Sequence, residues 1–287
     1  MTAKGGAVLS KIINEFGPGS IAFVVTTEDR KTNYDGCEDI KRISTDANIS
    51  VYSRDKLPSN VNSFVALAVS WRWLITENFS STIIFHDSLL PKYRGFAPLV
   101  SALIKGENSI GVTALLAREE YDSGPILAQK NTNLTYPVTI RQAIEKIIPC
   151  YEDLAVKVVN MIMKGNFKSV QQDETEATYS LWLNESDYQI DWNWDASHIR
   201  RFIDATGYPY KGAFTYILGS KVRVFKAEEE KDVEIENRIP GKVIFCRNGE
   251  PTIVCGTGLL KLKYAVFEDT NEDVLPLHKF RTRFGNF

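Results

Sequence analysis

Two short apolar runs near the start of the chain are typical of buried β-strands. Residues 20–27 and 63–70 carry hydrophobic side chains at successive positions, and polar, turn-rich sequence follows each run. Strands that are apolar on both faces belong to parallel sheets that helices cover on both sides. Residues 81–87 and 110–118 show similar patterns, so we expect further strands there.

Between these runs, apolar residues recur at helical spacing. The pattern predicts helices over 8–16 and 99–106, both ending in glycine-containing segments that suit helix termination, and a long helix over 139–165 with a kink near Pro149. Alternating strands and helices predict an α/β fold with an open, mainly parallel sheet flanked by helices, which is a Rossmann-like arrangement.

The opening of the chain departs from this class. An α/β chain of this kind normally starts with a buried strand that leads into a glycine-bearing turn and a helix, whereas "MTAKGGAVL" begins at the turn. Two alternatives remain open on the sequence. Either the first strand is missing upstream of Met1, or another segment replaces it.

The composition of the chain changes after the long helix. Residues 166–178 are polar and predict a linker, whereas alternation in 219–227 and 241–268 is typical of short antiparallel strands. The expected organisation is one domain over 1–165, a linker and connecting segment over 166–198, and a small β-rich C-terminal domain over 199–287.

The charge balance limits the classes of partner. The formal net charge is −2, and hydrophobic residues make up 44% of the chain, as in ordinary globular proteins. A protein that grips nucleic acid needs a basic surface to displace counterions from phosphates. The sequence therefore speaks against a nucleic-acid partner.

The apolar stretches, the N-terminus and the cysteine spacing bear on the cellular location and on metal binding. No apolar stretch reaches the roughly 20 residues that a membrane helix needs, and the N-terminus lacks the build of a signal peptide. The four cysteines are widely spaced without a Cys-x-x-Cys pair, so we expect free thiols, no metal site and a cytoplasmic location.

Two polar side chains follow predicted strands and could share one site. His86, one of only three histidines, ends the 81–87 run, and Asp122 lies in the loop that leaves 110–118. Open α/β sheets place their binding crevice at the carboxyl ends of strands. An aspartate there can hold and tune an imidazole for proton transfer, although either residue alone has a structural explanation.

The stretches around these two residues carry a family resemblance. "HDSLLPKYRG" (86–95), "GVTALLAREEYDSGPILAQ" (111–129), "ALAVSWRWLI" (66–75) and "IDWNWDASHIRRFIDATGYPYKGAF" (190–214) resemble the folate-dependent formyltransferases. This family includes methionyl-tRNA formyltransferase, glycinamide ribonucleotide formyltransferase and the sugar N-formyltransferases. The resemblance covers most of the chain from residue 20 to 214.

The resemblance implies a donor and roles for the paired residues. The donor would be N10-formyltetrahydrofolate, His86 would assist proton transfer and stabilise the developing oxygen, and Asp122 would orient His86 and accept protons. No metal is implied. The expected folate contacts lie after residues 66–71 and in the 118–122 loop: Arg72, Trp73, Leu74, Arg118, Glu119, Glu120 and Tyr121.

One position departs from the family pattern. The family has asparagine two residues before the histidine, where its amide donates to the developing oxyanion, and this chain has Ile84. Losing one such donor can cost about a hundredfold to a thousandfold in rate. Another donor could substitute, the enzyme could be slow, or the protein could have lost catalysis. Asn78 is close in sequence, and we favour an active enzyme.

The charge balance also bears on the acceptor. It disfavours tRNA, and purine-pathway members lack a second domain, which leaves a dTDP- or UDP-linked amino-deoxy sugar for surface polysaccharides such as lipopolysaccharide O-antigen. Expected substrate contacts are Ser88, Arg94, Tyr208, Tyr210 and Lys211.

The alternatives that remain are methionyl-tRNA formyltransferase and a catalytically degenerate folate- or nucleotide-binding protein. A formyltransferase for carrier-bound amino acids has no support, because no carrier domain adjoins. The sequence leaves the sugar and the nucleotide open, and it is compatible with a homodimer.

Overall fold

The computed structural model describes residues 3–28, 35–58, 60–165 and 167–285, which form two compact units. The first unit comprises residues 1–99, 108–134 and 143–181, and the second comprises 100–107, 135–142 and 182–287. The two units are described one at a time. No helix in the described ranges combines the length and the apolar character that crossing a bilayer requires.

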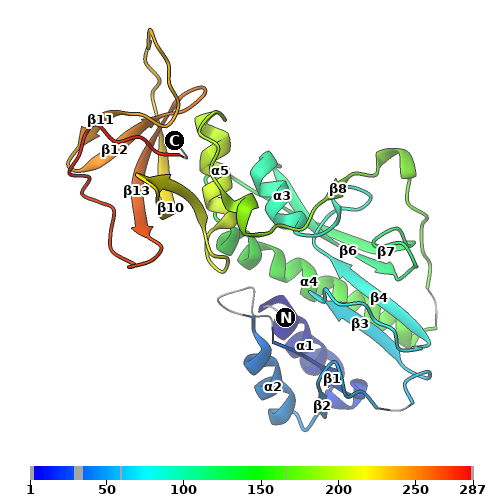
Figure 1. The fold of residues 1–287 in the computed structure, drawn as a ribbon. Helices are drawn as coiled ribbons and strands as arrows, with labels where there is room; N and C mark the ends of the chain where they lie inside the picture. The colour runs from blue at the N-terminus through cyan, green and yellow to red at the C-terminus, as the bar shows by residue number, and fades with distance from the viewer. Residues whose placement is uncertain (1–2, 29–34, 59, 166, 286–287) are drawn as a thin grey trace. The chain divides into compact units, whose positions relative to one another are not determined.

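The first unit alternates strands and helices (Figure 1). Its elements are α1 (Ala3–Phe16), β1 (Val24–Val25), α2 (Cys37–Asp46), β2 (Val51–Tyr52), β3 (Val65–Val69), β4 (Ser81–His86), β5 (Arg94–Gly95), β6 (Ser109–Leu116), β7 (Ile126–Asn133) and β8 (Tyr179–Ser180). The helices α3 (Pro98–Lys105) and α4 (Ile140–Met163) each have residues in both units.

The central sheet of this unit has the strand order β3-β4-β6-β7. β3 pairs with β4 in parallel, whereas β4–β6 and β6–β7 are antiparallel, and β1 and β2 form a separate parallel pair. The expected α/β fold is thus confirmed, with parallel pairing in β1–β2, β3–β4 and the short pair β5–β8. β7 is antiparallel because the connection from β6 over 117–125 is too short for a parallel crossover.

Local differences from the expected elements have physical reasons. The apolar run 20–27 contributes only Val24 and Val25 to a strand, and its first residue, Ser20, ends a 3-10 turn over Pro18–Ser20. The long helix continues through Pro149 to Met163. The expected linker over 166–178 returns to the first unit, where Val170 exchanges backbone hydrogen bonds of 2.8 Å with Ile126.

The second unit is built from one helix and an antiparallel sheet. Its elements are α5 (Ala196–Thr206), β9 (Ala213–Ile217), β10 (Ser220–Glu230), β11 (Val243–Arg247), β12 (Glu250–Val254) and β13 (Leu259–Phe267). The strand order is β11-β12-β13-β10-β9. This bears out a β-rich C-terminal part.

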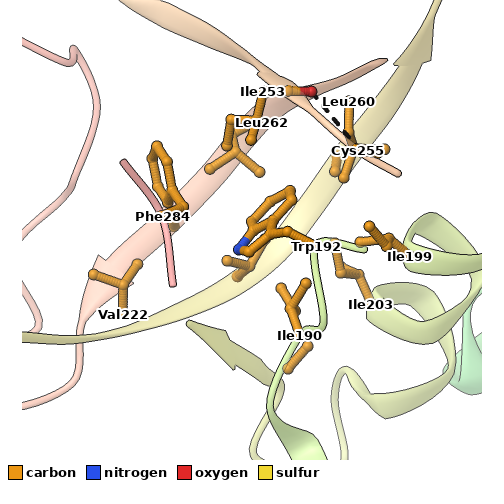
Figure 2. Packing of buried hydrophobic residues seen from close by; sticks show 14 of the residues in the cluster. Ile190, Trp192, Ile199, Ile203, Val222, Ile253, Cys255, Leu260, Leu262 and Phe284 are labelled. Atoms are coloured by element: carbon orange, nitrogen blue, oxygen red, sulfur yellow. Dashed lines mark hydrogen bonds between the residues drawn. The ribbon is translucent and has the colours of Figure 1, made fainter. Parts of the chain in front are cut away.

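The core of the second unit forms around Trp192 (Figure 2). Its ring lies near Phe284, with ring centroids 5.8 Å apart, and Ile203 of α5 belongs to the same buried cluster. The indole Nε1 donates a hydrogen bond of 2.9 Å to the Thr215 hydroxyl. A buried indole N–H requires such a partner.

Candidate active site

His86 ends β4 and is 7% exposed. Its Nε2 lies 2.8 Å from the carbonyl oxygen of Tyr93, and its Nδ1 lies 3.4 Å from Oδ1 of Asp122. Tyr93 has φ +60° and Gly95 has φ +100°, and this left-handed backbone turns the loop so that the Tyr93 carbonyl faces the imidazole. The two residues predicted to act together therefore do lie together.

The partners of the two ring nitrogens restrict the protonation of His86. A carbonyl oxygen only accepts hydrogen bonds, so Nε2 carries a proton. In the neutral ring, Nδ1 then presents a lone pair to Asp122, whereas the protonated ring donates on both sides. The separation of 3.4 Å exceeds an ordinary N–H···O bond. Oδ1 of Asp122 thus faces Nδ1 of His86 without an ordinary hydrogen bond between them.

Asp122 lies in the connection between β6 and β7 and is 9% exposed. It has φ +57°, a left-handed conformation that aspartate tolerates better than most residues. Its Oδ2 accepts a hydrogen bond of 2.9 Å from the Gly95 amide. One oxygen is thus fixed by the loop after β4, and the other faces His86.

Gly124 makes this connection possible. A Cβ at this position would lie 1.7 Å from the carbonyl oxygen of Leu116, which is backbone and cannot swing away. Only glycine lets the chain pass this close to the end of β6. The Asp-Ser-Gly stretch therefore holds Asp122 at the strand end.

The Gly124→Ala variant is expected to lose several kcal/mol of unfolding free energy, because strain of this kind falls among the largest single-residue effects. Urea unfolding of the purified protein measures the loss. Gly19→Ala is the matched control, since a Cβ at Gly19 meets no atom within 4 Å. Equal stability of the two variants would contradict this account of Gly124.

Arg94 does not fit the anion contact expected from sequence. It is 1% exposed, and its guanidinium donates bonds of 2.7 and 2.8 Å to the Glu174 carboxylate and 2.8 and 3.1 Å to Oε1 of Gln172. The Glu174 bond raises the pKa of Arg94, and Arg94 in turn lowers the pKa of Glu174. A guanidinium matched in this way has its charge neutralised, so we do not retain it as a substrate contact.

Ser88 supports the loop after His86. Its hydroxyl donates to the Lys92 carbonyl at 2.6 Å, and its own carbonyl accepts from the Thr113 hydroxyl at 2.6 Å. Gln129 donates to Thr113 as well, at 2.9 Å, and to the Leu90 carbonyl at 2.8 Å. The sequence motifs contained Thr113 and Gln129, but their role as supports on β6 and β7 became visible only through these contacts.

The residues expected to hold folate form two groups in the first unit. Arg72, Trp73 and Leu74 follow β3. Leu74 is 86% exposed, and the Arg72 guanidinium lies 5.1 Å from the Trp73 ring centroid. Trp71 and Trp73 are both half-buried with ring centroids 5.0 Å apart, so neither is a core residue.

The second group lies in the β6–β7 connection beside Asp122. Arg118, Glu119, Glu120 and Tyr121 are all exposed. The Tyr121 ring lies 6.2 Å from the ring of Phe96, which is also exposed. Two exposed aromatic rings next to the carboxylate offer a face on which a flat heterocycle can pack.

Ile84 shares the face of β4 with His86, because side chains two residues apart in a strand point to the same side. It pairs with Ala68 and Leu115 and is half-buried. Asn78 precedes β4 and lies near its amino end, whereas His86 is at the carboxyl end. A strand of this length spans roughly 16 Å, so Asn78 is too remote to replace the family asparagine.

A buried charge cluster behind the strand end was missed at the sequence level. Asp87 directly follows His86, forms an ion pair with Lys4 of α1 and accepts a hydrogen bond from the Tyr151 hydroxyl of α4. The Tyr151 ring stacks on Phe85 at a centroid distance of 6.1 Å, and Figure 1 shows α4 lying along the sheet. The cluster joins β4 to two helices.

The charges and the burial of this cluster determine the pKa values of Asp87 and Tyr151. Burial by itself would raise the pKa of Asp87, but Lys4 and the Tyr151 hydroxyl outweigh burial and hold that pKa below its ordinary value. Burial raises the pKa of Tyr151 well above its ordinary value, and the neighbouring Asp87 charge raises it further. Asp87 is therefore a carboxylate at neutral pH, and Tyr151 is a hydrogen-bond donor.

Asp87→Asn is expected to lower the unfolding free energy at pH 7 by about 3 kcal/mol, because it leaves the buried Lys4 without a counter-charge. The folded pKa of Asp87 lies below its unfolded value near 3.9. The difference in unfolding free energy between wild type and Asp87→Asn is therefore complete above the unfolded pKa. It disappears as the pH falls through the folded pKa.

Urea unfolding between about pH 3 and 7 measures this difference. Lys11→Met, which breaks the exposed pair of Lys11 with Glu15 at 3.6 Å, is the control and should cost under about 1 kcal/mol. A constant difference between wild type and Asp87→Asn across the whole range would refute the linkage.

The remaining expected substrate residues lie in the turn after α5, in the second unit. Tyr208 is exposed, with the Arg141 guanidinium 5.9 Å from its ring centroid. The Tyr210 amide donates to the Gly207 carbonyl at 2.9 Å. Lys211 faces the Glu185 carboxylate at 3.6 Å. These contacts lie within the second unit, so a role in substrate binding stays a prediction.

The described residues contain no group of three or more histidine, cysteine, aspartate or glutamate side chains arranged to hold a metal ion. Fold and site together define an α/β protein with a buried His–Asp pair at a strand end, followed by an antiparallel β domain.

The comparisons identify the family. The family model "Formyl transferase" matches residues 4–159, and "Formyl transferase, C-terminal domain" matches residues 183–272. The chain belongs to the formyl transferase family. This confirms the resemblance seen in the sequence motifs.

Individual relatives agree with this assignment. The methionyl-tRNA formyltransferase of Alkaliphilus metalliredigens is 32% identical over 176 residues, which are 59% of this chain and 55% of the relative. That of Chloroflexus aurantiacus is 34% identical over 178 residues, 62% of this chain and 56% of the relative. The chain thus spans about half the length of these curated relatives.

A solved structure matches nearly the whole fold. The sugar 3N-formyl transferase WlaRD, crystallised in the presence of dTDP and 5-N-formyl-THF, has a TM-score of 0.68 at 17% identity, covering 91% of this chain and 94% of that one. At this identity the match concerns the fold alone.

Proposed function

We propose that this protein transfers the formyl group of N10-formyltetrahydrofolate to the amino group of a dTDP- or UDP-linked amino-deoxy sugar. The family membership supports folate-dependent formyl transfer. The buried pair of His86 and Asp122 supports catalysis, because two such groups at one strand end can accept a proton from an amine.

The charge balance of the second unit is the main support for a sugar nucleotide over a tRNA. Residues 183–287 contain 16 acidic and 15 basic side chains. At least seven of the basic ones face a carboxylate within 4 Å, namely Arg200, Lys211, Lys221, Arg223, Arg238, Lys261 and Lys263. A surface neutralised in this way attracts a polyanion weakly.

The donor fits the residues around the site. The exposed rings of Phe96 and Tyr121 lie 6.2 Å apart, with Tyr121 adjacent to Asp122 in the chain, and the segment Arg72–Leu74, with Arg72 and Leu74 exposed, follows the neighbouring strand β3. A flat pterin or aminobenzoyl ring can pack on such aromatic faces. When bound, the donor supplies an activated formyl carbon for attack by the acceptor amine.

Residues of the chain would then accept the proton that the acceptor amine releases. Asp122 keeps the imidazole oriented through Oδ1, while its Oδ2 is held by the Gly95 amide. The proton lost by the attacking amine can be received at Nδ1 of His86 or on the Asp122 carboxylate. The protonated imidazole stabilises negative charge that develops nearby.

Incubation with N10-formyltetrahydrofolate and a panel of dTDP- and UDP-linked 3-amino and 4-amino sugars tests this proposal. We expect mass spectrometry to detect a formyl adduct on at least one sugar nucleotide, and none with Asp122→Asn. Methionyl-tRNA is included because the relatives at 32–34% identity carry that name. Formylation of the tRNA without formylation of any sugar would reject the proposal.

A further inference from the structure

Tyr151 of α4 contacts both chain neighbours of His86. Its ring stacks on the Phe85 ring at a centroid distance of 6.1 Å, and its hydroxyl donates a hydrogen bond to Oδ1 of Asp87. Neighbouring residues of a strand point to opposite faces, so Phe85 and Asp87 face α4 while His86 faces the other side. Tyr151 therefore holds the end of β4 from the side opposite to the imidazole.

The Asp87 carboxylate is held at both of its oxygens. Oδ1 accepts the hydrogen bond from Tyr151, and Oδ2 forms the ion pair with Lys4. Tyr151 is fully buried, and Phe85 is 3% exposed. Close packing on one neighbour and two polar contacts on the other fix the main chain on either side of His86.

The Tyr151 hydroxyl also connects β4 to the neighbouring strand β3. A side-chain hydrogen bond joins it to Ser70, the residue that follows β3. The single hydroxyl proton of Tyr151 goes to Asp87, so Ser70 is the donor in this second bond. A chain of hydrogen bonds therefore runs from Ser70 through Tyr151 to the Asp87 carboxylate.

Ser70 has a strained backbone just before the residues expected to hold folate. Its φ is +49°, a left-handed conformation that is uncommon for a residue other than glycine. Such strain persists only where the surrounding structure holds it, and it is concentrated at functional sites. The bond to Tyr151 is one such constraint, and Arg72–Leu74 begin two residues further on.

We propose that Tyr151 is a positioning residue for formyl transfer, which fixes the imidazole of His86 through Phe85 and Asp87 and ties it to the segment after β3. The inference rests on the proposed function, in which His86 receives a proton from the acceptor amine. Proton transfer requires hydrogen-bond distance between the two groups, and a displacement of about 1 Å can cost about a hundredfold in rate. Because Tyr151 is fully buried, it acts only through His86.

The Tyr151→Phe variant removes the hydroxyl and keeps the ring on Phe85. With N10-formyltetrahydrofolate and the sugar nucleotide that turns over fastest, we expect kcat to fall by about tenfold and both KM values to stay within about twofold. Tyr136→Phe is the matched control. It also removes a half-buried hydroxyl, whose bonds of 3.1 and 3.4 Å go to the carbonyls of Glu107 and Leu103, and it should leave kcat unchanged.

The double variant with His86→Asn separates positioning from a general loss of structure. If Tyr151 acts through His86, Tyr151→Phe has no further effect on kcat once the imidazole is gone. Two effects that multiply would contradict the proposal, and so would an equal loss of kcat in Tyr136→Phe.

A measurement without turnover keeps this inference separate from the proposed function. Nitrogen-15 NMR spectra resolve the rings of the three histidines, and the His86→Asn spectrum assigns the His86 signals. We expect Tyr151→Phe to displace these signals and to leave those of His198 and His278 in place. Unchanged His86 signals in a folded Tyr151→Phe protein would overturn the proposal, whether or not formyl transfer is established.

The other outcomes are equally distinct. Displaced His86 signals together with no product from any sugar nucleotide would reject the proposed acceptor and still support the positioning of His86 by Tyr151. If Tyr151→Phe does not fold, Ser70→Ala, which breaks the other end of the hydrogen-bond chain, is judged by the same spectra and the same criterion.

Discussion

Replacing His86 with asparagine is expected to lower kcat by about a thousandfold while leaving folate affinity nearly unchanged. The shorter asparagine side chain cannot reach the Tyr93 carbonyl, which the imidazole contacts through its distal Nε2, and it cannot take up a proton at the position facing Asp122. Asp122→Asn is expected to act similarly, because an amide oxygen can still accept from Gly95 while the negative charge beside the imidazole is lost.

Steady-state kinetics with the best acceptor and calorimetric titration with a folate measure the two quantities separately. His278→Asn and Asp153→Asn are the controls, because the His278 side chain is exposed and the Asp153 carboxylate forms an exposed ion pair with Lys130 at 3.0 Å. Both should keep near wild-type turnover. Turnover within about threefold of wild type in either active-site variant would remove that residue from the mechanism.

Ile84→Asn is expected to raise kcat by about tenfold or more, since one oxyanion donor contributes about a hundredfold to a thousandfold where it is well placed. Position 84 lies on the same face of β4 as His86. The gain should be below the full value, because Ile84 is half-buried between Ala68 and Leu115 and the surrounding strands are packed around an alkyl group.

Ile84→Val controls for packing, because it removes one methylene without adding a donor and should leave kcat unchanged. Thermal unfolding of both variants separates a loss of folded protein from a change in chemistry. A well-folded Ile84→Asn with unaltered or reduced kcat would mean that the site already has its oxyanion donor from another group.

The strand ends could be predicted because the signal is local. Runs of apolar residues mark β4 and β6, and polar side chains that closely follow such runs lie at the edge of the sheet. For this reason His86 and Asp122 could be paired across 36 positions of sequence before any contact was known. The glycines that bend the loops around them, Gly95 and Gly124, also stand within the same short motifs.

Partners that are distant in sequence could not be predicted in this way. Arg94 was expected to contact an anion because a guanidinium can pair two oxygens at once, and its actual partner Glu174 lies 80 positions later. Lys4 and Asp87 are 83 positions apart, and each resembles an ordinary surface charge when read alone. Pairing of this kind depends on tertiary packing, which hydrophobic periodicity does not encode.

The contacts of Arg94 also determine where an expression clone of the first domain can stop. A clone ending at residue 165 would leave the buried guanidinium without Glu174 and Gln172 and would remove β8, the partner strand of β5. One ending just after Ser180 retains all three. The polar stretch after α4, which resembles a domain linker, thus supports the loop after His86 through its contacts with Arg94.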